Sequence, residues 1–133
     1  MNVLLDTHIF LWAMLEPERL SEPQTELLGS VSCQVWLSPI TIWECLLLAE
    51  RGRVVLAPEA HGWLAEARAR VGAREATLTH AVAARSRQVQ LAHQDPADRF
   101  LAATASVYDL PLVTADERLL AGQGFPIWQP PTG

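Results

Sequence analysis

The alternation of short apolar segments with helical segments is the feature that most constrains how this chain folds. The apolar segments lie at residues 3–5, 35–37, 76–78 and 112–114, and segments with helical patterns separate them. Strands joined through helices pair in parallel, because a parallel neighbour needs a long crossover connection. Such a sheet is covered by helices on both faces. The sequence therefore predicts a three-layer α/β/α sandwich with a central, mainly parallel sheet, built by residues 1–133 as a single domain.

Capping and breaking residues set the expected limits of the helices. Ser21, Ser38 and Asp95 are candidate N-caps, and a proline follows both Ser38 and Asp95 at the first helical position, where it is favoured. The expected helices cover 8–15, 22–28, 39–51, 58–71, 81–89 and 96–108, with a short helix after Asp116. A last edge strand is expected at 126–128.

The composition points to a globular cytoplasmic protein. Half of the 133 residues are hydrophobic and 19% are charged, a balance that argues against disorder. We find no apolar stretch of about 18 residues that would suggest a membrane span. The N-terminus reaches Asp6 without a basic region, so it reads as a first strand and not as a signal peptide. Cys33 and Cys45 lack metal-type spacing and are expected to be reduced thiols.

Two aspartates follow apolar strands and should lie at one edge of the sheet. Asp6 ends the first strand, and Asp116 comes just after the strand at 112–114. The carboxyl ends of parallel strands share one edge, and ligands of open α/β sheets bind there. Each aspartate has an alternative role as a helix N-cap. Two at the same edge are harder to explain by capping alone.

Glu44 and Asp98 are acids in surroundings that should be apolar. Glu44 lies in the middle of the segment 40–48, whose apolar residues surround it and predict a largely buried helix. A buried carboxylate is costly unless it is bound to a metal ion or paired with an arginine, for which Arg51 and Arg99 are the candidates. Asp98 heads the apolar face of the helix 96–108, although Asp95 and Asp98 also suit a capping pair. We interpret Asp95 as the cap and Asp98 as a functional residue.

If Asp6, Glu44, Asp98 and Asp116 converge, their mutual repulsion requires a counter-charge. Two like charges about 4 Å apart repel by about 4 kcal/mol at an effective dielectric constant of 20. A hard divalent cation such as Mg²⁺ or Mn²⁺ relieves this repulsion, because it prefers carboxylate oxygens. A metal ion in such a site activates water and neutralises charge on a phosphodiester. The acidic set is therefore the predicted site of phosphodiester hydrolysis.

Four segments in this order resemble the PIN-domain ribonucleases, and within them the VapC-type toxins of toxin–antitoxin systems. The resemblance covers nearly the whole chain and rests on Leu4-Leu5-Asp6-Thr7-His8, on residues 38–44 (SPITIWE), on residues 93–103 (HQDPADRFLAA) and on Leu112-Val113-Thr114-Ala115-Asp116. It implies a Mg²⁺- or Mn²⁺-dependent endoribonuclease, a homodimer, and a small cognate antitoxin as partner. Asp6, Glu44, Asp98 and Asp116 match the acidic positions of the family, with Asp6, Asp98 and Asp116 as the main metal ligands.

The resemblance also suggests residues around the acidic set. Thr7 and Thr114 match polar positions beside the site, although either also suits a cap, and Asp95 is common in this branch of the family. RNA phosphates need cations outside the acidic pocket, and the main candidates are Arg51, Arg53 and Arg99. We expect the tryptophans at 12, 36 and 43 to be core or dimer contacts and not base-stacking residues, and the four histidines to be surface or capping residues.

The charge pattern excludes some rivals and leaves others open. The net charge is −5, and all ten basic residues are arginines. Receiver domains and dehalogenase-like phosphatases also carry acids at this sheet edge, but they use a lysine, which this chain lacks. A non-catalytic module that binds RNA or protein through a PIN-like fold, and a nuclease acting on DNA, remain alternatives.

Overall fold

The computed structural model describes residues 1–132, which form a central parallel sheet between two layers of helices. The strands are β1 (Asn2–Leu5), β2 (Gln34–Leu37), β3 (Arg74–Glu75) and β4 (Leu112–Val113). The helices are α1 (Thr7–Leu15), the 3₁₀ helix η1 (Pro17–Arg19), α2 (Glu22–Gly29), α3 (Pro39–Glu50), α4 (Ala60–Arg70), α5 (His80–Arg85), α6 (Pro96–Tyr108) and α7 (Glu117–Leu120). The predicted α/β/α class is confirmed.

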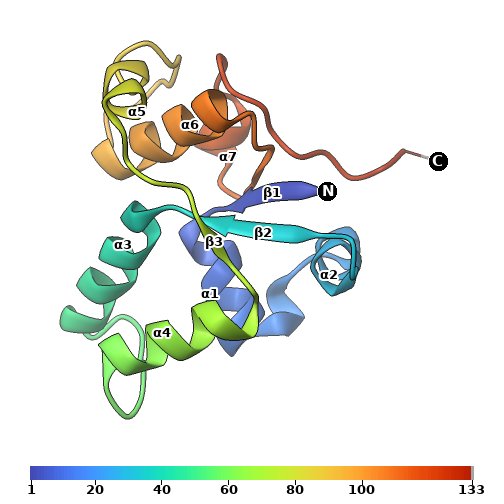
Figure 1. The fold of residues 1–133 in the computed structure, drawn as a ribbon, viewed down its shortest axis with the longest axis vertical. Coiled ribbons are helices and arrows are strands. Elements are labelled where there is room, and N and C mark those ends of the chain that lie inside the picture. The colour runs from blue at the N-terminus through green and yellow to red at the C-terminus, as the bar shows by residue number, and fades with distance from the viewer. Residues whose placement is uncertain (133) are drawn as a thin grey trace.

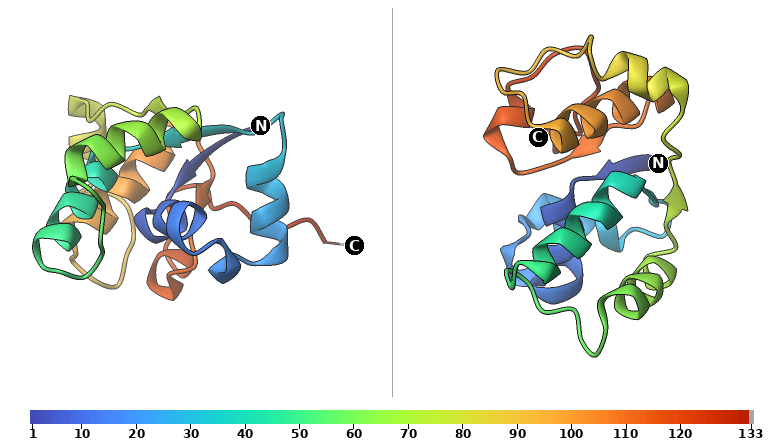
Figure 2. Two further views of the ribbon diagram at one scale, coloured as in Figure 1. Left: turned by 90° about the horizontal axis from the view of Figure 1, so that it is seen from below. Right: turned by 90° about the vertical axis from the view of Figure 1, so that its left-hand side faces the viewer.

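Strands are added to the sheet first on one side of β1 and then on the other. The sheet has the order β3-β2-β1-β4, and every pair in it is parallel. The chain moves outward from β1 to β3 through α1, α2, α3 and α4, which lie on one face. It then returns through α5 and α6 on the other face to pair β4 with β1 (Figures 1 and 2). This reversal makes the β1–β4 edge the expected ligand position of the fold.

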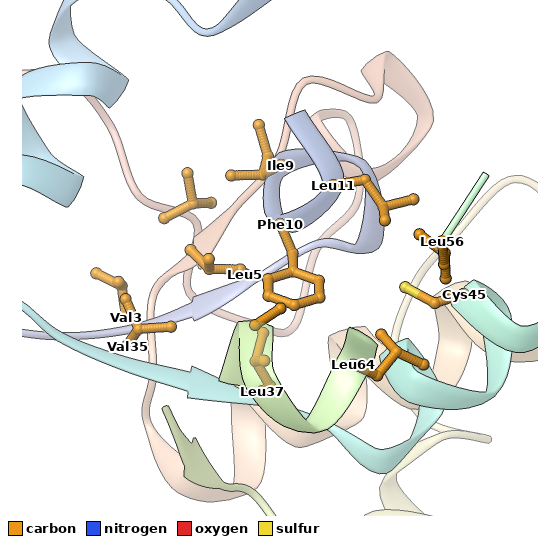
Figure 3. Close-up of a cluster of buried hydrophobic side chains, with 12 residues drawn as sticks. Val3, Leu5, Ile9, Phe10, Leu11, Val35, Leu37, Cys45, Leu56 and Leu64 are labelled. Carbon is orange, nitrogen blue, oxygen red and sulfur yellow. The ribbon is translucent and has the colours of Figure 1, made fainter. Parts of the chain in front are cut away.

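Alternation of side chains along the central strands builds two separate cores. Val3 and Leu5 of β1 point toward the face covered by α1, α3 and α4, where they pack in the cluster around Phe10 (Figure 3). Leu4 points to the opposite face and packs with Leu101 of α6 and other apolar residues. Successive strand residues face opposite sides of a sheet, so a strand buried on both faces must be apolar throughout.

The predicted N-caps are confirmed. The Ser21 hydroxyl accepts a hydrogen bond from the amide of Gln24, and the Gln24 side chain returns one from the Ser21 amide. Ser38 caps α3 through the amide of Ile40, and Asp95 caps α6 through the amide of Asp98. These bonds satisfy amides that lack partners inside the helix. They fix where α2, α3 and α6 begin.

Several expected limits were wrong. The third strand is Arg74–Glu75, not 76–78, although the Ala76 amide still bonds to the Leu37 carbonyl. Helix α4 begins at Ala60, because the Glu59 side chain caps it, and α5 ends at Arg85 and not at about 89. The predicted strand at 126–128 is reduced to a single parallel bridge between Ile127 and Leu112. A local cap therefore sets the start of α4, whereas hydrogen bonds to distant segments act at Ala76 and Ile127.

Helix α3 is less buried than its apolar sequence predicted. Within α3 only Thr41 and Cys45 are fully buried, and Trp43 is 54% exposed. Trp43 therefore lies outside the core, and of the two expected roles only that of a dimer contact remains a prediction. Helix α3 packs on α1, α4 and α6 and leaves its remaining face open (Figure 1). Among residues 1–132 no helix is long and apolar enough to cross a bilayer. Cys33 and Cys45 are free thiols, as expected.

Candidate active site

Asp6 lies at the point where the chain leaves β1 for α1, at the edge shared with β4. Asp6 is only 6% exposed, and its carboxylate Oδ2 accepts a hydrogen bond of 2.7 Å from the Thr114 hydroxyl. Asp6 precedes α1 in the N-cap position, yet its side chain makes no capping bond within the described structure. The capping alternative for Asp6 therefore does not explain this buried carboxylate.

Glu44 reaches the same region from helix α3. Its Oε1 accepts a hydrogen bond of 2.5 Å from the hydroxyl of Thr7, the first residue of α1. That bond fixes Glu44 beside Asp6, because Thr7 follows Asp6 directly in the chain. The predicted alternative, an ion pair of Glu44 with Arg51 or Arg99, is absent from residues 1–132. Glu44 is half-buried, so one side of its carboxylate faces the solvent.

Asp98 enters the site from the first turn of α6. Asp95 takes the cap position, and Asp98 is left 8% exposed with its carboxylate directed at His93. The Asp98 Oδ2 and His93 Nε2 atoms are 2.7 Å apart. An ionised carboxylate only accepts hydrogen bonds, so the His93 Nε2 carries the proton in this pair. His93 was expected to be a surface or capping residue, and that expectation was wrong.

Asp116 follows β4 and caps the short helix α7. Its Oδ1 accepts a hydrogen bond of 2.9 Å from the Arg118 amide, so Asp116 does act as the N-cap that the sequence offered as an alternative. That role uses one carboxylate oxygen. The Arg118 guanidinium also lies 3.2 Å from Asp116 Oδ2 and 3.7 Å from Asp98 Oδ2. Arg118 is not among the site residues predicted from the sequence. The only signal for it is its position two residues after Asp116.

The four carboxylates influence one another, which shows that they share one region. Burial raises the pKa of Asp6, Glu44 and Asp98 above their usual values, and nearby carboxylates raise each further. The negative neighbours are Asp98 for Asp6, Asp6 and Asp98 for Glu44, and Asp95 and Asp116 for Asp98. The hydrogen bond from Thr114 acts in the opposite direction on the pKa of Asp6.

Asp116 behaves differently from the other three acids. Partial burial by itself raises the pKa of Asp116, but the hydrogen bonds and positive charge of Arg118 outweigh it, so the pKa is lowered overall. Asp116 therefore stays ionised more readily than Asp6, Glu44 or Asp98. Arg118 thus places a permanent positive charge beside Asp116 and Asp98.

The donor set suits a hard divalent cation, although it is not arranged as a finished ligand cage. Asp6, Glu44, Asp98 and Asp116 lie in one region, connected through Thr7, Thr114 and Arg118, and carboxylate oxygens are the ligands that Mg²⁺ and Mn²⁺ favour. Among residues 1–132, however, no three side chains already hold metal-ligand geometry. Arg118 occupies an oxygen of Asp98 and one of Asp116. The donor chemistry therefore fits a divalent ion, and Arg118 lies on two of the oxygens that such an ion would use.

The structure separates the three arginines that were predicted to contact RNA. Arg99 is 6% exposed, and its guanidinium donates to the carbonyls of Ser86 and Val89 at 2.9 and 2.8 Å. The prediction that Arg99 contacts RNA was wrong, because its buried guanidinium is bonded to the segment 86–89 and cannot reach a phosphate. Arg51 lines an open hollow of about 340 Å³ together with Glu44 and Trp43, whereas Arg53 lies at a different hollow.

The fold and the site together define a class of protein: an α/β/α domain whose acidic residues lie at the point where the strand order reverses, between β1 and β4. A family model described as the PIN domain matches residues 3–122. The chain belongs to the PIN domain family. It is 35% identical over 119 residues to Ribonuclease VapC22 of Mycobacterium tuberculosis, covering 89% of either protein. The resemblance seen in the sequence is confirmed.

Solved structures support the same fold. The chain superimposes with a TM-score of 0.72 on a chain of VapBC2 from Rickettsia felis bound to a DNA fragment from the promoter, at 13% identity, covering 96% of this chain and 98% of that one. It also matches a toxin–antitoxin complex from Klebsiella pneumoniae with a TM-score of 0.61 and 18% identity, covering 94% and 99%. Likenesses at this level of identity establish the fold alone.

Proposed function

We propose that this protein is an endoribonuclease that hydrolyses RNA phosphodiester bonds with Mg²⁺ or Mn²⁺. The observation that carries the proposal is the convergence of Asp6, Glu44, Asp98 and Asp116 from four separate elements onto the β1–β4 edge. Membership of the PIN domain family and the similarity to Ribonuclease VapC22 support the choice of RNA. The structures similar to this chain are toxin–antitoxin complexes, so we further propose that residues 1–133 act as one toxin domain with a small antitoxin partner.

Each acidic residue has a proposed part. Asp6, Asp98 and Asp116 would hold the metal ion, which when bound lowers the pKa of a water molecule and neutralises charge on the phosphate. Thr114 orients Asp6, and His93 orients Asp98, through the hydrogen bonds that they make to these carboxylates. Such outer partners fix the direction of ligand oxygens. Asp95 remains on the rim as the cap of α6.

Glu44 is suited to handle the proton of the attacking water and to help hold the metal ion. Thr7 donates to its Oε1, which leaves Oε2 of this half-buried residue to accept a hydrogen bond from water. Burial raises the pKa of Glu44, which makes it a better proton acceptor than an ordinary glutamate. A base must lie within hydrogen-bond reach of the proton that it removes, and the open side of Glu44 offers that access.

The decisive test is cleavage of labelled RNA, including tRNA and rRNA, with Mg²⁺, Mn²⁺ or EDTA. The wild type is expected to cut only with metal, and Asp98→Asn is expected to lose activity by at least about a hundredfold, since it removes a ligand charge. Asp109→Asn is the matched control, because Asp109 is exposed and has a left-handed backbone that asparagine also adopts.

Two results would contradict the proposal. Cleavage that persists in EDTA would exclude the metal-dependent mechanism. No cleavage of any RNA by folded protein, together with no thermal stabilisation by Mn²⁺, would favour the alternative of a non-catalytic binding module. Cleavage of DNA in preference to RNA would keep the chemistry and correct the substrate.

Sedimentation of the purified protein tests the homodimer that we propose from the family resemblance.

A further inference from the structure

Arg118 occupies the position between two carboxylates that a metal ion also needs. Its Nη2 lies 3.2 Å from Asp116 Oδ2 and 3.7 Å from Asp98 Oδ2. The same Asp98 oxygen already receives His93 Nε2 at 2.7 Å. A divalent cation on these oxygens would repel a guanidinium at this distance. The metal ion and Arg118 therefore cannot share the two carboxylates in the arrangement seen here.

The Arg118 side chain is free to leave without disturbing the fold. It is 59% exposed, and its helix is held by the buried side chain of Leu119 and by the bond from the Arg118 amide to Asp116 Oδ1. That backbone bond does not depend on where the guanidinium lies. Ion pairs made by such an exposed guanidinium contribute little to stability, so a divalent ion is strong enough to displace it.

We propose that metal binding displaces Arg118 from Asp98 and Asp116, and that the freed guanidinium then binds a phosphate oxygen of the RNA. This inference rests on the proposed ribonuclease function. A displaced Arg118 remains attached to α7 beside Asp116, so it stays at the rim of the site. Its planar donors match two oxygens of one phosphate. Arg99 cannot take this part, because its guanidinium is buried on the Ser86 and Val89 carbonyls.

The first test measures metal binding without RNA. Equilibrium binding of Mn²⁺, followed by electron paramagnetic resonance of the free ion, is compared for wild type and Arg118→Gln. We expect Arg118→Gln to bind Mn²⁺ about three- to tenfold more tightly, since a competing positive charge is removed. Arg19→Gln is the matched control, because Arg19 forms an exposed pair with Glu16 at 3.1 Å and is expected to leave Mn²⁺ affinity unchanged. Unchanged or weaker binding by Arg118→Gln would overturn the displacement.

The second test measures RNA binding without cleavage. Glu44→Gln serves as a background that does not cut, and binding of a fluorescent single-stranded RNA is followed by anisotropy with Mg²⁺ and with EDTA. Adding Arg118→Gln is expected to weaken binding about three- to tenfold with Mg²⁺, to change it less than about twofold in EDTA, and to reduce the salt slope by about one. Adding Arg19→Gln should have no such metal-dependent effect. Equal effects in Mg²⁺ and EDTA would overturn the phosphate role.

Different results would contradict the ribonuclease function and the role of Arg118. Absence of any cleavage by the wild type would remove the proposed function and this inference with it. A wild type that cuts RNA with metal, beside an Arg118→Gln variant that matches Arg19→Gln in both binding assays, would remove only the role assigned to Arg118.

Discussion

The Thr114 hydroxyl donates a 2.7 Å hydrogen bond to Asp6 Oδ2, joining residues that are 108 positions apart in the sequence. The bond ties the end of β4 to the end of β1 inside the protein. The Thr114 oxygen also accepts from the amide of Asp116, so one hydroxyl connects two of the proposed metal ligands.

Replacing that hydroxyl should weaken the site more than the fold. Thr114→Val keeps the shape but loses both hydrogen bonds, and loss of such an outer partner typically lowers metal affinity or activity about ten- to a hundredfold. Thr114→Ser keeps the hydroxyl and should retain most of the activity. RNA cleavage rates and Mn²⁺ affinity measure the difference. Equal loss in both variants would mean that the methyl group, and not the hydroxyl, is what matters.

The stability of the metal-free protein should depend on pH through Asp6. Burial raises the pKa of Asp6 in the folded state above its usual value of 3.8. The folded protein then holds that proton more tightly than the unfolded chain does, so ionised Asp6 opposes folding above its raised pKa and has no such effect below 3.8.

Asp6→Asn should therefore be more stable than wild type in EDTA at pH 8, by on the order of 1–3 kcal/mol, because it removes a buried charge and its repulsion from Asp98. The advantage should shrink as the pH falls through the raised pKa toward 3.8. Urea unfolding of both proteins across this range measures it. Lower stability of Asp6→Asn at pH 8 would show that the carboxylate is needed for folding.

His93 should act on the site through Asp98. His93→Ala removes the donor to Asp98 Oδ2, and we expect Mn²⁺ affinity and cleavage rate to fall about tenfold or more. His93→Gln offers an amide donor and should recover part of the loss. His61→Ala changes an exposed histidine of α4 and is the matched control. If His93→Ala and His61→Ala are equally active, His93 has no positioning role.

Arg99 should matter for stability. Arg99→Ala leaves the buried carbonyls of Ser86 and Val89 without donors, and hydrogen bonds from charged groups contribute about 1.5–3 kcal/mol each. We expect a loss of about 3–5 kcal/mol in the free energy of unfolding by urea. Arg87→Ala, at an exposed position nearby, should stay within about 0.5 kcal/mol of wild type. A small effect of Arg99→Ala would show that water replaces the guanidinium.

The amino-acid sequence by itself determined the order of elements, the sheet edge and the four acids. Short strands that are apolar throughout, prolines after Ser38 and Asp95, and acids directly after strands are local patterns, and parallel pairing follows from them by the rules of chain connection. Asp6 and Asp116 lie at one edge because the carboxyl ends of parallel strands share that edge. The PIN domain resemblance rested on the same residues.

Only the tertiary structure decided which partners those acids have. The pair of His93 with Asp98, the position of Arg118 between two acids, the burial of Arg99 and the exposure of Trp43 depend on which surfaces meet after folding. A charged or aromatic residue on a helix carries no local mark of its neighbour across the fold. The limits of β3 and α5 were missed for the same physical reason, since non-local contacts outweigh local propensity at the ends of short elements.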